Sequence, residues 1–382
     1  MNKGFKFRIY PNQEQEILIL KTFGCTRWIW NHMLEDKIKA YQQDGISLKT
    51  NPASYKQDNP WLKDVDSLAL TSVWKQLNSA YSKFFKEPKV GFPKFKSKKH
   101  AKQSYTTNNQ PKSQAIRIEG SYIRLPKLGL VKIKLHRHLP ENYEIKSVTI
   151  SRSPTGKFYV SINVEYDYKV PTKELYINNS VGLDYQSNGL FIDNQGNQPN
   201  YPRYFRLTED KLAKEQRKLS LMTFNSNNYQ KQKLKVAKIH EKIANQRKDF
   251  LHKLSYNFAN QYDYVFVEDI NLQSISQFGH LGKSTSDNGY GIFRIFLAYK
   301  LADRGKVLHK VDKWFASSKT CSTCGCYHPE IVNSLSIREW VCPDCETKHD
   351  RDINAAKNIR NKGMLEITTV GTTGLAPLCC KH

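Results

Sequence analysis

Long hydrophobic runs are missing from this sequence of 382 residues. No apolar segment approaches the roughly 18 residues that a membrane-spanning helix needs, and no secretory signal pattern opens the sequence. We therefore expect no membrane partner and no secretion. Without secretion, the cysteines are expected to stay reduced, which disfavours a disulfide framework.

Acidic residues are scarce relative to basic ones. The chain has 35 Asp and Glu against 60 Lys and Arg, which leaves a formal net charge of +25. An excess of this size predicts a polyanionic partner. A membrane surface is also polyanionic, but the lack of long apolar segments favours nucleic acid. Aromatic residues make up 12% of the chain and alternate with basic ones, a pattern that suits stacking on unpaired bases.

One basic run, residues 91–102 (GFPKFKSKKHAK), has aromatic residues between its lysines. A packed helix would not use this composition, so the run predicts a nucleic-acid-binding loop. A solvated linker is the alternative, and the interleaved phenylalanines count against it. The lysines expected to contact nucleic acid are Lys94, Lys96, Lys98 and Lys99.

Cysteine spacing indicates a metal site. Four of the eight cysteines form two C-x-x-C pairs, separated by the seventeen residues 325–341, which is within the range of a four-cysteine zinc ribbon. We expect one structural zinc ion, because such an ion can fold a segment too small to bury its own core. Two disulfides are the alternative, and Cys326 is expected to be a spectator. The predicted ligands are Cys321, Cys324, Cys342 and Cys345.

Hydrophobic periodicity divides the first half of the chain. Residues 6–10 alternate as a strand, whereas residues 13–43 and 67–86 carry apolar side chains at helical spacing. From residue 115 to 168 the period is two, which predicts an antiparallel β module. Basic residues at its outward positions, including Arg124, fit a small barrel with a basic face, although any soluble β surface could look similar.

Three separated acids predict a second metal site. Asp184 lies inside an apolar strand, Glu268 ends another, and Asp352 opens a helical segment. Strand ends are where ligands collect in α/β sheets, and a carboxylate in an apolar strand is costly unless it is paired or binds a cation. Such a cluster suits phosphodiester hydrolysis by two Mg²⁺ or Mn²⁺ ions. Helix caps and ion pairs with lysines are the alternative for each acid taken singly.

The order of these motifs resembles the TnpB family of transposon-encoded RNA-guided DNA nucleases, which are related to the type V CRISPR effectors. The resemblance covers essentially the whole chain. It is carried by the segments at residues 6–11, 92–96, 182–184, 247–253, 267–271, 317–325, 342–345 and 350–356.

The resemblance implies a fold of mixed α/β and β class. It has a wedge-type β-barrel, residues 1–11 and 112–172, interrupted by a helical recognition lobe, residues 12–111. A RuvC nuclease domain of RNase H-like fold would follow, residues 178–316 and 349–363, with the zinc ribbon, residues 317–348, as an insertion. Residues 364–382 show no clear period and are expected to be a disordered tail.

The resemblance also implies function. Asp184, Glu268 and Asp352 match the family's catalytic acids, and Asp352 is preferred to Asp350 because of the D-x-N-x-A spacing. A guide RNA from the transposon end would pair with double-stranded target DNA. The protein would cut this DNA next to a short adjacent motif. We expect a prokaryotic cytoplasmic protein, at the nucleoid when bound to DNA. The alternatives are a nuclease-inactive RNA-guided regulator, which should have lost an acid, and a protein-only transposase.

Overall fold

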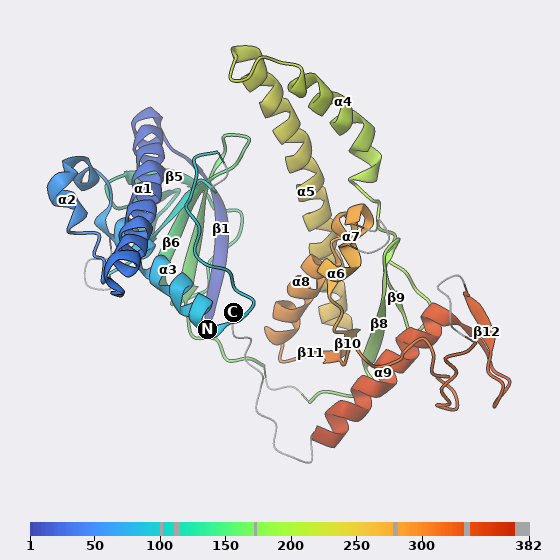
Figure 1. The fold of residues 1–382 in the computed structure, drawn as a ribbon. Coiled ribbons are helices and arrows are strands. Elements are labelled where there is room, and N and C mark those ends of the chain that lie inside the picture. Colours follow the sequence, from blue (N-terminus) through green and yellow to red (C-terminus); the bar gives the residue numbers. More distant parts are fainter. Residues whose placement is uncertain (100–101, 111–114, 172–173, 278–281, 332–336, 371–382) are drawn as a thin grey trace. The chain divides into compact units, whose positions relative to one another are not determined.

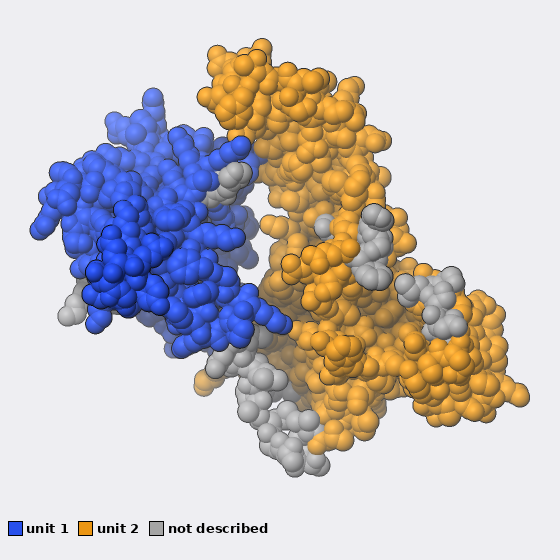
Figure 2. Space-filling view, in the orientation of Figure 1, with its two compact units in different colours: residues 1–168 blue, residues 169–382 orange. Residues whose placement is uncertain are grey.

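The structure is a computed structural model, and it describes all residues except 100–101, 111–114, 172–173, 278–281, 332–336 and 371–382. It divides into two compact units, residues 1–168 and 169–382. Figure 2 shows the two units in different colours. In the described residues, no helix is long and apolar enough to cross a membrane.

The first unit is built on a seven-stranded sheet in the order β2-β6-β7-β1-β5-β4-β3, in which neighbouring strands run antiparallel. Its edge strands, β2 and β3, are consecutive in the chain. Asn109 joins them at one end, because its side chain donates to the Ile116 carbonyl (3.2 Å) and accepts from the Ile116 amide (3.1 Å). The sheet therefore curls back on itself. The strands are β1 (Asn2–Tyr10), β2 (Ser104–Asn108), β3 (Arg117–Glu119), β4 (Tyr122–Leu125), β5 (Gly129–Lys134), β6 (Glu144–Arg152) and β7 (Phe158–Glu165).

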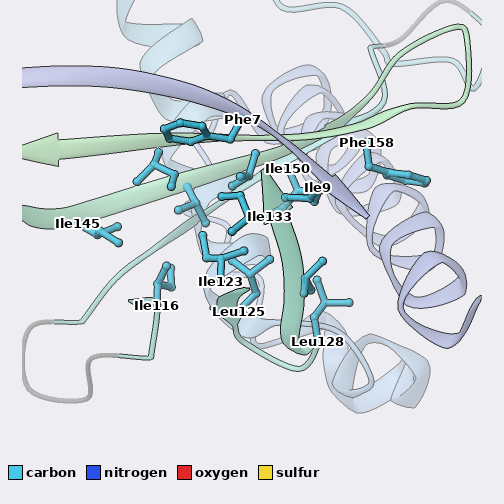
Figure 3. Close-up of a cluster of buried hydrophobic side chains, with 14 of the residues drawn as sticks. Phe7, Ile9, Ile116, Ile123, Leu125, Leu128, Ile133, Ile145, Ile150 and Phe158 are labelled. Carbon is cyan, nitrogen blue, oxygen red and sulfur yellow. The ribbon is translucent and has the colours of Figure 1, made fainter. Parts of the chain in front are cut away.

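The core of this sheet follows from the two-residue period of its strands. On β7 the residues from Phe158 to Val164 alternate between buried and less buried positions, and β1 buries Phe5, Phe7 and Ile9 in the same way. Figure 3 shows Phe7, Ile9 and Phe158 in one apolar cluster with Ile123, Ile133 and Ile150. The expected antiparallel β module is thus confirmed. The sheet also includes β2, although residues 104–108 were expected to belong to the helical lobe.

Two long helices occupy the expected positions. At the start of the first, Asn12 and Gln15 form a capping box, in which each side chain bonds the other residue's backbone N–H. The two helices pack through an apolar cluster that includes Ile29, Met33 and Leu70. The helices of the unit are α1 (Gln13–Asp44), α2 (Tyr55–Asp58), η1 (Pro60–Lys63) and α3 (Ser67–Lys86).

The second unit contains a four-stranded sheet in the order β11-β10-β8-β9. Strands β8, β10 and β11 are parallel, and β9 forms the expected hairpin with β8. A separate antiparallel pair, β12 and β13, lies in the cysteine-rich segment. The strands are β8 (Ser180–Gln186), β9 (Leu190–Asp193), β10 (Tyr264–Glu268), β11 (Val307–Val311), β12 (Glu339–Val341) and β13 (Lys348–Asp350).

The helices of this unit include the expected charged pair, α4 and α5, which projects beyond the sheet in Figure 1. At its base, Arg247 forms an ion pair with the buried Asp287 (3.1 Å), and Lys300 donates to the His252 carbonyl (2.6 Å). These contacts tie α5 to the segments that follow it. The helices are η2 (Arg206–Thr208), α4 (Glu209–Ser220), α5 (Asn227–Gln261), α6 (Leu272–Gln277), α7 (Gly282–Asn288), α8 (Tyr290–Ala302) and α9 (Arg351–Val370).

Helix α9 lies directly against the sheet, and two glycines permit this close contact. A Cβ atom on Gly182 would lie 2.2 Å from the Ala356 carbonyl oxygen, and one on Gly363 would lie 2.1 Å from the Phe266 ring. Helix α9 also runs to Val370, so residues 364–370 are helical and not part of a disordered tail. Met364 and Ile367 explain the extension, because they pack on Phe266 and Val311. The rest of the expected tail lies outside the described residues.

Candidate metal centres

The sheet brings two of the three predicted acids together. Strands β8 and β10 are parallel neighbours with Leu183 opposite Val267, so Asp184 and Glu268 follow at equivalent positions on adjacent strands. Asp352 comes from the first turn of α9, which contacts both β8 and β10. Three segments far apart in the sequence therefore supply one cluster, the acid cluster (Asp184, Glu268 and Asp352).

The acid cluster is electrostatically strained. Burial raises the pKa of Asp184 to about 8, and the nearby charges of Glu268 and Asp352 add to the increase. Burial likewise raises the pKa of Glu268, partly offset by a hydrogen bond from Ser317. Carboxylates that repel one another in a desolvated place favour either a bound proton or a bound cation.

Each acid is held by a neighbour. Gln186 donates to Asp184 (3.0 Å), the Ser317 hydroxyl donates to Glu268, and Arg338 forms an ion pair with Asp352 (2.7 Å). Sequence reasoning missed these three contacts, because each partner is polar, common and recognisable only from its place in the fold. The one feature of the sequence that could have pointed to Arg338 is its position four residues before Cys342, in the segment between the two cysteine pairs.

Asp350 has a different role from Asp352. Its carboxylate accepts from the backbone N–H groups of Asp352 and Ile353, both at 2.9 Å, so it caps the start of α9. Asp352 instead lies close enough to Asp184 to raise its pKa. The geometry thus favours Asp352 as the acid that faces the cluster.

The acid cluster fits hard divalent cations. Its donors are carboxylate oxygens, the ligands that Mg²⁺ and Mn²⁺ prefer. Among the described residues, the three carboxylates do not form a group whose ligand atoms all lie within 4.8 Å of one another.

The four predicted cysteines do gather at one point. The sulfur atoms of Cys321, Cys324, Cys342 and Cys345 lie within 4.8 Å of one another. The Cys321–Cys345 and Cys324–Cys342 sulfur distances are both 3.6 Å. Tetrahedral zinc with bonds of about 2.3 Å would place its sulfur ligands roughly 3.8 Å apart, so these residues fit one zinc ion.

The two cysteine pairs form matching turns. Gly325 N donates to the Cys321 carbonyl at 2.9 Å, and Glu346 N donates to the Cys342 carbonyl at 2.8 Å. Gly325 and Glu346 both have left-handed backbone conformations, with φ values of 80° and 57°. Cys326 follows the first turn and lies near Cys324 and Asp344, outside the group of four. Cys379 and Cys380 lie outside the described residues.

The predicted nucleic-acid contacts differ in their accessibility. Lys94, Lys98, Lys99 and Arg124 are exposed. The Lys96 ammonium, in contrast, lies 3.6 Å from the centroid of the Trp30 ring, and burial lowers its pKa to about 8. Its backbone also exchanges two hydrogen bonds with the Asn31 side chain, at 2.8 and 3.0 Å. Lys96 thus anchors the basic loop to α1.

Three family models match parts of this chain. Residues 161–278 match a family model described as "Probable transposase", and residues 290–359 match one described as "Cas12f1-like, TNB domain". Residues 1–45 match a model described as a helix-turn-helix domain, where this structure has β1 and α1.

Two curated relatives match over nearly their whole length. A Streptomyces pristinaespiralis protein named "Putative RNA-guided DNA endonuclease" is 33% identical, covering 95% of this chain and 90% of the relative. An Escherichia coli protein with the same description, InsQ, is 30% identical, and the match covers 94% of this chain and 92% of the relative.

The fold also has a solved counterpart. A cryo-EM structure of a Cas12f1–sgRNA–target DNA complex aligns with a TM-score of 0.60 and 14% identity. The alignment covers 94% of this chain and 99% of the other, so the likeness in fold extends over nearly both chains.

Proposed function

Because this chain belongs to the TnpB family, we propose that it is an RNA-guided DNA endonuclease of a prokaryotic transposon. Its relatives carry that description, and its net charge of +25 suits two nucleic-acid partners. A guide RNA would select double-stranded target DNA by base pairing, and the protein would read a short adjacent motif. Such a protein would act in the cytoplasm, at the nucleoid.

The acid cluster is the proposed nuclease centre, of RuvC type. The observation that carries this proposal is the convergence of Asp184, Glu268 and Asp352 from β8, β10 and α9, with the pKa of Asp184 raised to about 8. Two Mg²⁺ ions bound there would supply Lewis acidity and an activated water for phosphodiester hydrolysis.

The protein's own residues prepare this site. Asp184 and Glu268 would bind cations through their carboxylates, and binding would displace any proton held by Asp184. Ser317 and Gln186 hold two of the carboxylates in place by hydrogen bonds. Arg338 pairs with Asp352 and is 59% exposed, so its guanidinium can also reach an incoming phosphate.

The cysteine cluster is proposed to hold one structural zinc ion as a four-cysteine ribbon. Four thiolates leave no open coordination position, which suits a structural rather than a catalytic ion.

The curled sheet of the first unit and its helices would be the wedge-type barrel and the recognition lobe. Exposed Lys94, Lys98, Lys99 and Arg124 are proposed to contact nucleic-acid phosphates. Guide-RNA affinity across salt concentrations for the combined alanine variant tests this, because each lost contact should lower the salt slope by about one unit.

The decisive experiment uses the ribonucleoprotein as it purifies. Sequencing the RNA that copurifies identifies the guide, and a plasmid library carrying the matching target reveals the adjacent motif. We expect cleavage with Mg²⁺, loss of cleavage with EDTA, and recovery on adding Mg²⁺ back. Guide-dependent binding without any cleavage would instead indicate an inactive regulator. Sequence-specific cutting without RNA would indicate a protein-only transposase.

A further inference from the structure

Two buried asparagines link the cysteine cluster to the acid cluster. Asn354 and Asn358 lie four residues apart on α9, so both face the same side of the helix, and they are only 1% and 5% exposed. Their side chains bond the backbone of residues 317–322, the segment that leads from β11 into the first cysteine turn.

The contacts are short and numerous. Asn354 donates to the Thr320 carbonyl (2.8 Å) and accepts from the Ser322 amide (2.8 Å). Asn358 donates to the carbonyls of Ser317 (2.8 Å) and Thr320 (2.6 Å). These side-chain amides therefore form hydrogen bonds with three backbone groups on either side of Cys321 that lie outside regular secondary structure.

The same segment contacts one of the acids directly. Ser317 donates through its hydroxyl to Glu268 while its carbonyl accepts from Asn358. Helix α9, which carries both asparagines, also carries Asp352 in its first turn. Hydrogen bonds thus join the first cysteine turn to Glu268 through Ser317, and the turn is connected to Asp352 through helix α9, which carries both asparagines.

We propose that Asn354 and Asn358 are positioning residues that couple zinc occupancy at the first cysteine turn to the placement of Glu268 and Asp352. The acids' part in this proposal rests on the proposed nuclease function. When the four thiolates are tied together, residues 317–322 hold the conformation that the asparagines bind. When the turn opens, both Ser317 and α9 lose their fixed partner. By linkage, weakening the asparagine contacts must also weaken zinc retention.

The first arm of the test measures zinc and does not depend on nuclease activity. Release of zinc from the purified protein to a chromogenic chelator should be about tenfold faster in Asn354→Ala and in Asn358→Ala, although all four cysteines remain. Asn361→Ala is the matched control, because Asn361 is exposed on the same helix and should release zinc at the wild-type rate. Wild-type release rates in both asparagine variants would overturn the coupling.

The second arm measures the acid cluster. In Asn354→Ala the Mn²⁺ concentration for half-maximal cleavage should rise about tenfold, with a smaller change in the rate at saturating Mn²⁺. A purely structural role would lower only the active fraction and leave half-saturation unchanged, and that result would refute the proposal. Ser317→Ala should raise half-saturation while keeping zinc release normal, since it removes the hydroxyl that contacts Glu268 and keeps the carbonyl that Asn358 binds.

Two further variants keep the test decisive. Asn358→Ser retains a short hydroxyl donor and should give intermediate values, so it serves if Asn354→Ala does not fold. Normal zinc release and half-saturation in Asn358→Ser and Asn358→Ala would then reject the coupling. If Asp184→Ala still cleaves, the proposed nuclease centre is wrong, whereas the zinc arm still decides whether the asparagines secure the cysteine turn.

Discussion

The two proposed metal centres are assembled in opposite ways. All four cysteines lie within residues 321–345, and two local turns bring them together. The three acids span residues 184–352 and meet only because two parallel strands and a later helix pack together. The cysteine cluster is therefore a property of a short segment, whereas the acid cluster is a property of the whole second unit. A given perturbation should therefore affect the two centres to different degrees.

The largest expected effect distinguishes two acids that are two residues apart. Asp352→Asn should reduce target cleavage to background because it removes a charged ligand, while guide and target binding persist. Asp350→Asn should cleave at a rate close to wild type, since an asparagine side chain still accepts the helix-capping hydrogen bonds. A plasmid cleavage assay measures both variants. The reverse result would assign the metal-binding role to Asp350.

Removing one thiolate should affect the zinc centre first. Cys342→Ser is expected to lower zinc content from one ion per chain to near none. It should also destabilise the segment, because the free energy of zinc binding contributes directly to the stability of its folded state. Elemental analysis and thermal unfolding check this. Cys326→Ser is the control and should retain its zinc. Full zinc content and unchanged stability in Cys342→Ser would remove Cys342 from the ligand set.

A backbone perturbation should affect the acid cluster more strongly than the cysteine cluster. Gly182→Ala places a Cβ 2.2 Å from the Ala356 carbonyl oxygen and 2.7 Å from the Arg360 nitrogen, so α9 must shift and carry Asp352 with it. We expect a loss of about 1–3 kcal/mol of stability and slower cleavage. The matched variant Gly189→Ala, in the same hairpin, meets no atom closer than 3.5 Å. Equal unfolding temperatures and cleavage rates in the two variants would contradict this account.

The smallest expected effect is on stability against pH. With its pKa at about 8, Asp184 keeps a proton in the folded metal-free protein that the unfolded chain loses near pH 4. The folded state binds more protons, so this group's contribution to stability falls as pH rises from about 4 to 8. Asp184→Asn cannot ionise and should raise the unfolding temperature of the metal-free protein by a few degrees at pH 8. At pH 4 the difference should vanish, and a constant difference would exclude Asp184 as its cause.

Sequence patterns predicted the features that local chemistry determines. The gathering of the four cysteines, the hairpin after Asp184 and the long helices are confirmed because spacing and periodicity encode them directly. Strand β2 escaped detection because its buried side chains, Tyr105 and Thr107, alternate within a short polar segment. The extension of α9 also escaped, since it depends on apolar contacts with a sheet formed much earlier in the chain.

The partners of the acids could not be predicted for a related reason. Gln186, Ser317 and Arg338 acquire their roles only when strand, loop and helix are already packed together. Lys96 shows the converse, since its charge suggested a phosphate contact and its place in the fold directs it to Trp30. Residue type predicts what a side chain can do, whereas the fold determines what it meets.

The close contact between α9 and Gly182 also sets an order of events during synthesis. The ribosome makes Asp352 168 residues after Asp184, and at 5–20 residues per second that interval is roughly 8–34 s. Throughout it, the face of the sheet at Gly182 lacks the helix that will cover it, and the acid cluster lacks its third carboxylate. On the proposed function, a nascent chain therefore cannot cut DNA until its last described helix has emerged and packed against the sheet.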